Sequence, residues 1–160
     1  MQIREAVSDD FVSIWPIFYE IVSRGDTYAY ATDTTQEQAK VLWMDMPERT
    51  YVVEEGGHIL ATYYLKTNQA GPGSHVCNCG YMVASAARGR GLATAMCQHS
   101  QAIANALGYK AMQFNFVASS NESAVRLWHT LGFKTVGRLP GAFNHPKLGF
   151  IDALIMYRDL

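Results

Sequence analysis

The fold is decided by the stretch Val83-Ala84-Ser85-Ala86-Ala87-Arg88-Gly89-Arg90-Gly91-Leu92-Ala93-Thr94-Ala95-Met96. An apolar run leads into it and predicts a strand over Val76–Val83. Apolar residues then recur at helical spacing, which predicts a helix over Leu92–Leu107. The first-turn N–H groups of a helix lack intrahelical partners, and the helix dipole gives them partial positive charge. A strand, a loop with two glycines and two arginines, and a helix therefore predict a site for a phosphate-bearing cofactor.

Two common nucleotide-binding loops do not fit this stretch. A P-loop requires Lys followed by Ser or Thr after its last glycine, and neither pair follows Gly91. The dinucleotide fingerprint requires G-x-G-x-x-G/A, but Thr94 stands at its last position. That fingerprint also needs an acidic residue at the end of the next strand, and the strand expected over Tyr109–Val117 has none. The phosphate site therefore belongs to another class.

Two motifs resemble those of the GNAT superfamily of N-acetyltransferases. Arg88, Gly91 and Ala93 match the superfamily's Q/R-x-x-G-x-G/A pyrophosphate loop. Farther along, the chain reads Asn121-Glu122-Ser123-Ala124-Val125-Arg126-Leu127-Trp128-His129-Thr130-Leu131-Gly132-Phe133. This segment resembles the pattern N-x-x-A-x-x-L-Y-x-x-x-G-F, with Trp128 where Tyr is usual.

The resemblance implies an α+β fold and a single GNAT domain over residues 1–160. In this fold a mixed, curved β-sheet of about seven strands carries helices on both faces, in the order βααβββαβαββ. Two central parallel strands, here Val76–Val83 and Tyr109–Val117, are expected to splay apart where the cofactor enters.

The resemblance also implies acetyl-CoA (coenzyme A) as the cofactor. Its pantetheine arm would lie along the edge of the Val76–Val83 strand, and its pyrophosphate would meet the N-terminus of the next helix. The cofactor-binding residues expected on this basis are Tyr81, Met82, Val83, Arg88, Gly89, Arg90, Gly91, Leu92, Ala93, Thr94, Asn121, Ala124 and Trp128. Asn121 has a second explanation, because Asn is a preferred N-cap residue of helices.

The usual acid and base of the family are missing. GNAT enzymes often carry a Glu on the central strand as base and a Tyr before G-F as acid. Here the strand has no carboxylate, and Trp128 has no proton of suitable acidity. A thiolate whose parent thiol has a pKa of about 8.5 can still leave without a strong acid.

Asn78 and Asn115 are the expected catalytic and substrate-binding residues. Each interrupts one of the two strands that should splay, and a carboxamide can orient an amine or a carboxylate. The segments around them, together with 131–141, resemble fungal acetyltransferases that detoxify proline analogues such as azetidine-2-carboxylate. In those enzymes an asparagine on each of these strands contacts the substrate. The alternative is that both are buried amides that hydrogen-bond the backbone where the strands part.

Residues of two loops are further candidates for the acceptor pocket, because loops commonly carry binding residues. Tyr28 and Tyr30, with Asp33, lie in the early loop, and His145, with Phe143 and Asn144, lies in the late one. His145 and His75 are the only histidine candidates for a base, a role that histidine often has in catalysis.

Composition limits the partners. At 160 residues the chain is expected to form one domain, and its formal net charge of −1 argues against nucleic acid and anionic membranes as partners. No apolar run approaches the roughly 20 residues of a membrane span, and no signal peptide is recognisable, so a cytoplasmic location is expected. The family resemblance adds a homodimer as a possible assembly. Cys77 and Cys79 lie too far apart on one strand to share a zinc ion, so no metal site is expected.

Several local features are also predicted. Pro16 should kink or break the first helix, and Thr34 or Thr35 should cap a second one that ends near Met46. Gly56-Gly57 should form a hairpin turn, and 140–149 should form a loop.

These observations point to an N-acetyltransferase that acetylates the amine of a small molecule by direct attack in a ternary complex, with amino acids and proline analogues as candidate acceptors. Two alternatives stay open at this stage. One is acetylation of protein or peptide N-termini, and the other is an acyl-CoA-binding sensor without catalysis.

Overall fold

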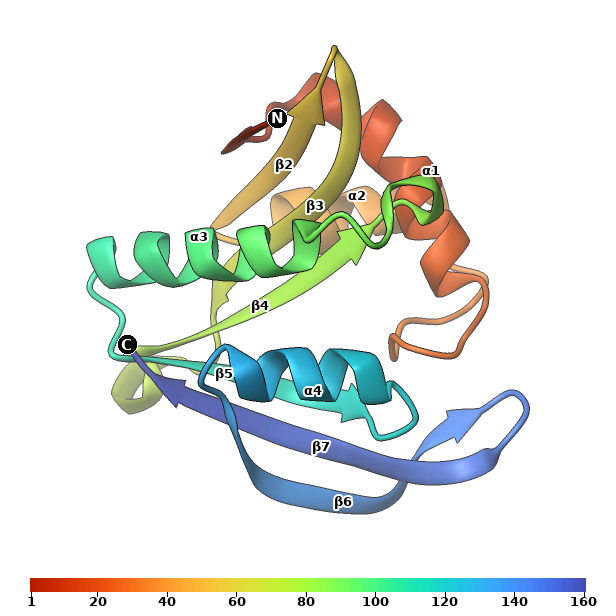
Figure 1. The fold of residues 1–160 in the computed structure, drawn as a ribbon, viewed down its shortest axis with the longest axis vertical. Coiled ribbons are helices and arrows are strands. Elements are labelled where there is room, and N and C mark those ends of the chain that lie inside the picture. The colour runs from red at the N-terminus through yellow and green to blue at the C-terminus, as the bar shows by residue number, and fades with distance from the viewer.

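The computed structural model describes residues 1–160 and contains one seven-stranded sheet in the order β1-β2-β3-β4-β5-β7-β6. All neighbouring strands are antiparallel except β4 and β5, which are parallel. The strands are β1 (Gln2–Glu5), β2 (Arg49–Glu55), β3 (His58–Thr67), β4 (Val76–Val83), β5 (Ala111–Ala118), β6 (Lys134–His145) and β7 (Gly149–Asp159). The order of strands and helices confirms the predicted α+β fold (Figure 1).

Helices cover both faces of the sheet. They are α1 (Phe11–Val22), α2 (Gln36–Lys40), α3 (Leu92–Ala106) and α4 (Glu122–Thr130), with short helical turns at η1 (Ser8–Asp10), η2 (Val41–Asp45), η3 (Gly71–Gly73) and η4 (Ser85–Ala87). One buried cluster joins α1, α2 and η2 to the sheet around Phe18 and Trp43. A larger cluster joins α3 and α4 to the opposite face around Met96 and Phe114. Each helix is thus held by its apolar side, and the sheet forms the middle layer.

The two parallel strands separate soon after they meet. β4 and β5 pair only at Val76–Ala111 and Cys77–Met112. Beyond these pairs the strands diverge, and the loop that follows α1 approaches the opening (Figure 1). The predicted splay of the central strands is confirmed.

The structure refines two local predictions and corrects a third. Pro16 lies inside α1 without breaking it, because one lost backbone hydrogen bond is outweighed by the buried apolar face of the helix. Thr35 caps α2 and the helical segment ends at Met46, as predicted, but from Val41 it is a π-helical turn that buries Trp43. The predicted loop 140–149 is mostly strand, since β6 passes Pro140 through an irregularity between Leu139 and Phe143.

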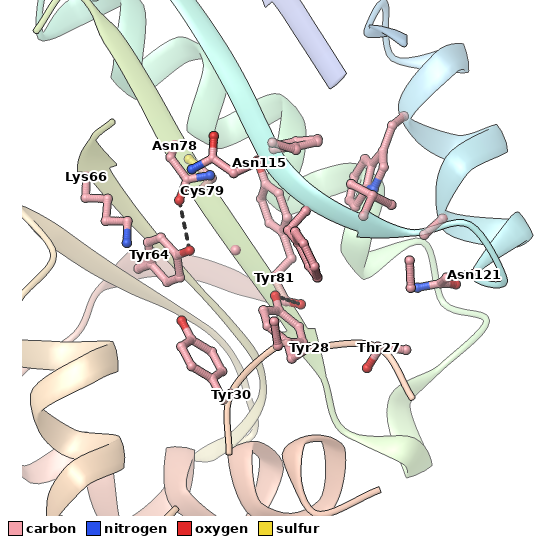
Figure 2. A pocket seen from close by; sticks show the side chains of 18 residues that line it. Thr27, Tyr28, Tyr30, Tyr64, Lys66, Asn78, Cys79, Tyr81, Asn115 and Asn121 are labelled. Carbon is pink, nitrogen blue, oxygen red and sulfur yellow. Dashed lines mark hydrogen bonds between the residues drawn. The ribbon is translucent and has the colours of Figure 1, made fainter. Parts of the chain in front are cut away.

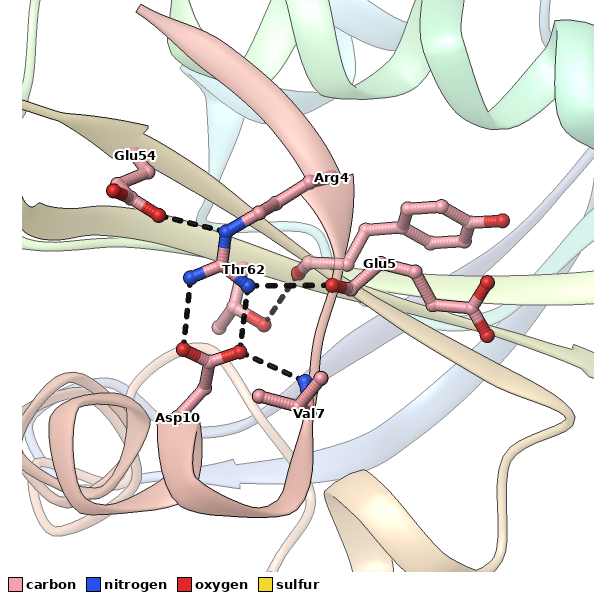
Figure 3. Close-up of polar contacts among 7 residues, drawn as sticks. Arg4, Glu5, Val7, Asp10, Glu54 and Thr62 are labelled. Carbon is pink, nitrogen blue, oxygen red and sulfur yellow. Dashed lines mark hydrogen bonds and ion pairs between the residues drawn. The ribbon is translucent and has the colours of Figure 1, made fainter.

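Arg4 joins β1 to β2 and to the turn before α1 (Figure 3). Its Nε donates to Glu54 Oε2 at 2.7 Å, and its Nη1 and Nη2 donate to the two oxygens of Asp10 at 2.7 and 2.9 Å. Asp10 also accepts the Val7 N–H at 2.8 Å. The Arg4 guanidinium therefore lowers the pKa of the Asp10 carboxyl.

Candidate functional site

Beyond its last pair with β5, strand β4 has a free backbone edge. The Ala84 N–H donates to the Leu60 carbonyl at 2.9 Å, in register with the ladder between β3 and β4. Because backbone direction alternates along a strand, even-numbered residues of β4 turn their N–H and C=O groups toward β3. The backbone groups of Cys79, Tyr81 and Val83 therefore face the opening, where β5 no longer pairs with them. Such an edge can accept an extended ligand as an added strand.

A pocket of about 270 Å³ lies in this opening. Its walls come from β3, β4, β5, the start of α4 and the loop after α1. In Figure 2 the side chains of Tyr28 and Tyr30 enter from that loop, Asn78 and Asn115 come from the two splayed strands, and Asn121 lies on the side of α4. Eight of the sequence-predicted residues thus meet around one cavity, namely Tyr81, Asn121, Ala124 and Trp128 of the cofactor set and Tyr28, Tyr30, Asn78 and Asn115 of the acceptor set, whereas Val83 and residues 88–94 lie outside its lining.

The loop before α3 carries a run of available backbone donors. None of the N–H groups of residues 89–94 donates to another protein atom. Gly89 and Gly91 both have a φ of 74°, a left-handed conformation that favours glycine, and no atom lies within 4 Å of the position of a Cβ at either. Arg88 is exposed and makes no ion pair, whereas Arg90 is paired with Glu55 at 2.6 Å. This donor set at a helix N-terminus fits the pyrophosphate of coenzyme A.

Asn121 precedes α4 but does not cap it with its side chain. Its Oδ1 accepts only a long hydrogen bond from the Ser123 hydroxyl at 3.4 Å, and its side chain lines the pocket. Ala124 and Trp128 follow on the same wall. The centroid of the Trp128 ring lies 5.1 Å from that of Tyr81, so Trp128 packs as part of the pocket wall. Its indole N–H is not acidic enough to protonate a leaving thiolate.

Asn78 closes the point at which β4 and β5 part. It is 5% exposed; its Nδ2 donates to the Gln113 carbonyl at 2.9 Å, and its Oδ1 accepts from the Tyr64 hydroxyl at 2.9 Å. The buried-amide explanation therefore describes Asn78 correctly, and its side chain also lines the pocket. One N–H of its amide remains without a protein acceptor, because a carboxamide carries two.

Asn115 differs from Asn78 in being exposed. Its Nδ2 donates to Asn68 Oδ1 at 2.7 Å, and its Oδ1 accepts from Gln113 Nε2 at 2.9 Å. The register between β5 and β7 shifts between Phe114 and Val117, so Asn115 lies in a bulge and strict alternation fails there.

Two aromatic side chains form the acceptor side of the pocket. The rings of Tyr28 and Tyr30 stack with centroids 5.6 Å apart and planes 5° apart. The Tyr28 hydroxyl donates to the Tyr81 carbonyl at 2.8 Å, which joins the loop to the free edge of β4. Burial raises the pKa of both phenols, so they are neutral donors at ordinary pH.

Comparison with known proteins agrees with this geometry. Residues 5–133 match the model of the acetyltransferase (GNAT) family. The chain belongs to the GNAT family. Its fold is similar to that of a GCN5-related N-acetyltransferase from Kribbella flavida, with 45% sequence identity, a TM-score of 0.94, and coverage of 99% of this chain and 97% of that chain.

Two further relatives extend the comparison. A phosphinothricin acetyltransferase from Sinorhizobium meliloti, solved in complex with AcCoA, is 22% identical, has a TM-score of 0.87, and aligns over 99% of this chain and 88% of its own. N-acetyltransferase aca1 of Schizosaccharomyces pombe is 34% identical over 103 residues, which are 61% of this chain and 47% of that protein. This GNAT chain therefore spans about half the length of that curated relative.

Some predicted residues do not reach the pocket. Met82 turns its backbone toward β3 and buries its side chain between the sheet and α1, so it offers the cofactor neither group. His145 lies in the turn after β6, where its Nδ1 accepts the N–H groups of Lys147 and Leu148 at 3.1 Å. His75 is exposed before the start of β4. Neither His75 nor His145 lines the pocket of this GNAT chain, so neither lies where a base would act on the acceptor.

The sequence interpretation missed Tyr64, Lys66 and Gly80, which line one face of the GNAT site. Tyr64 and Lys66 of β3 lie opposite Gly80 and Asn78 of β4, and all four line the pocket. A Cβ at Gly80 would lie 2.6 Å from the Tyr64 ring, so glycine is needed for this close approach. A strand period of two would have grouped Tyr64 with Lys66, but only the register shows what they face.

No helix of the structure is long and apolar enough to cross a membrane. No group of three or more His, Cys, Asp or Glu side chains is placed to hold a metal ion, and the three cysteines are buried. The homodimer and the cytoplasmic location stay predictions.

Proposed function

We propose that this chain transfers the acetyl group of acetyl-CoA to the amine of a small molecule. One observation carries the proposal: the free edge of β4 leads from the unpaired N–H groups of residues 89–94 into the pocket. The diphosphate would bind at the helix N-terminus, and the backbone of Tyr81 and Val83 would hold the arm. Acetyl-CoA supplies an activated thioester when it is bound.

Direct attack on the thioester is favoured over an acyl-enzyme. Cys79 lines the pocket but is 5% exposed, and burial raises the pKa of its thiol well above the ordinary value. No histidine lines the pocket to activate it. The acceptor nitrogen therefore bonds to the acetyl carbon as the C–S bond breaks, and the proton that the nitrogen loses goes to the departing thiolate or to solvent.

The lining of the pocket contains no carboxylate and no histidine. The protein therefore supplies orientation in place of a conventional base, and the acceptor reacts as the unprotonated amine. Asn78 would orient it through the second N–H of its amide, which has no acceptor in the protein, and Tyr28, whose hydroxyl is fixed on the Tyr81 carbonyl, would form the adjacent wall.

The size of the cavity supports a small acceptor rather than a peptide. About 270 Å³ must hold both the thioester end and the acceptor. Pockets that take drug-sized ligands are about 300–1,000 Å³, so little room remains for a chain of several residues.

Release of free thiol from acetyl-CoA, measured against a panel of small amines and short peptides, tests the proposal. We expect release with small amines and little with peptides. Release with peptides alone would favour N-terminal acetylation, and tight binding of acetyl-CoA without release for any acceptor would favour the sensor.

A further inference from the structure

Lys66 places an unpaired ammonium group at the acceptor side of the pocket. It lies on β3 directly opposite Asn78 of β4, and its Nζ is 5.2 Å from the centroid of the Tyr64 ring (Figure 2). The side chain is partly buried and lines the pocket. It takes part in none of the seven ion pairs of the structure, which all lie elsewhere.

No other group in the lining carries a formal charge at neutral pH. The lining has no Asp, Glu, Arg or His, and burial raises the pKa of Tyr28, Tyr30 and Tyr64, so these phenols stay neutral. The pocket is therefore positive on its acceptor side. A simple amine, which is mostly an ammonium ion in water, would be repelled by Lys66.

An acceptor that carries a carboxylate next to its amine removes this conflict. Its carboxylate would pair with Lys66, and the second N–H of the Asn78 amide, which has no protein acceptor, lies on the strand opposite. The ring of Tyr64 holds the ammonium by a cation–π contact, so the charge is positioned before the acceptor binds.

We propose that Lys66 is the carboxylate anchor of the acceptor site, and that the acceptors are small amino or imino acids. This inference rests on the proposed acetyltransferase function. The stacked rings of Tyr28 and Tyr30 form an apolar wall for the remainder of the acceptor, which must be short because the cavity is about 270 Å³.

The test compares acceptors that differ only in the carboxylate. Proline and azetidine-2-carboxylate are paired with their amides and with pyrrolidine and azetidine, and thiol release is followed for the wild type, Lys66→Met and Lys147→Met. Methionine is also unbranched and keeps most of the length of the side chain without its charge. Lys147 is an exposed lysine in the turn after β6 and serves as the matched control.

We expect the wild type to prefer the acids. Lys66→Met should raise the KM for the acids about 10- to 100-fold, the loss typical of one charge-assisted contact, with a smaller change in kcat. The KM for acetyl-CoA and the turnover of the amides should stay within about two-fold of wild type, and Lys147→Met should match wild type for every acceptor.

Two results would overturn the inference separately from the function. Equal kcat/KM for acids and decarboxylated amines in the wild type would keep the acetyltransferase and remove the anchor. The same holds if Lys66→Met reduces all acceptors equally. If none of the acceptors supports thiol release, the proposed function is overturned, and the anchor with it.

Discussion

The hydroxyl of Tyr28 donates a hydrogen bond to the backbone carbonyl of Tyr81 at 2.8 Å. This bond connects two segments far apart in the chain, the loop after α1 and the edge of β4 that β5 has left. A strand edge normally satisfies its carbonyls through a neighbouring strand, and here a side chain does so. The acceptor side of the pocket is therefore fixed in place by the strand that would also hold the cofactor.

Tyr28→Phe removes this hydrogen bond and keeps the ring. We expect a loss of about 1 kcal/mol in the free energy of unfolding and a several-fold rise in the KM of the acceptor, because the loop is no longer tied to β4. Urea unfolding and thiol-release kinetics measure the two effects. Tyr19→Phe is the control, since Tyr19 is 57% exposed on α1 and its hydroxyl has no hydrogen bond within the protein. Equal kinetics in both variants would contradict a positioning role for Tyr28.

Gly91→Ala tests the phosphate loop. Gly91 has a φ of 74°, where an L side chain is strained by about 1–2 kcal/mol although space for it is open. We expect that cost in stability and a KM for acetyl-CoA raised at least several-fold, because the neighbouring N–H groups turn away from the ligand. Gly57→Ala is a matched control: its φ is 78°, its surroundings are equally open, and it lies in the β2–β3 turn. A similar rise in KM for both variants would show that general loosening is responsible.

The sequence was sufficient to predict those features that short segments determine by themselves. The helical period after Leu92 and the Gly56-Gly57 turn both depend on local conformation, and the structure has each of them. The order of elements read along the chain agrees with the family resemblance and is confirmed by the structure.

Features that depend on contacts between distant segments could not be predicted in this way. Lys66 is opposite Asn78 only because of the register of β3 and β4, and nothing near Lys66 in the sequence indicates that pairing. For Asn121 the residue type alone favoured a helix cap, and only the family resemblance assigned it to the cofactor side; its side chain lines the pocket and does not cap α4. Pro16 does not break α1, because the buried side of the helix outweighs the local penalty.

Asn78→Ala should lower the free energy of unfolding more than Asn115→Ala does, although both asparagines line the pocket. Removal of the Asn78 amide leaves the Tyr64 hydroxyl and the Gln113 carbonyl without their partner, so we expect a loss of about 1–3 kcal/mol. Asn115 is exposed, and its loss should cost less than about 0.5 kcal/mol. Both variants should lower acceptor turnover in the thiol-release assay. Unchanged turnover in both would show that the asparagines do not contact the acceptor.

Asp10→Asn tests the link between Arg4 and the start of α1. The Arg4 guanidinium lowers the pKa of Asp10, so the folded state holds the carboxylate more strongly than the unfolded chain does. Its contribution to stability is therefore present at neutral pH and is lost as the pH falls below about 4, the ordinary carboxyl value, and through the lowered pKa of the folded state. We expect Asp10→Asn to be less stable than wild type by about 1–3 kcal/mol at pH 7, with the difference shrinking toward pH 3. Urea unfolding at both pH values measures this.

Glu122→Gln is the control, because the Glu122–Arg126 pair at 3.5 Å is exposed and should contribute little. A constant difference between wild type and Asp10→Asn at all pH values would show that the charge of Asp10 is not what stabilises this turn.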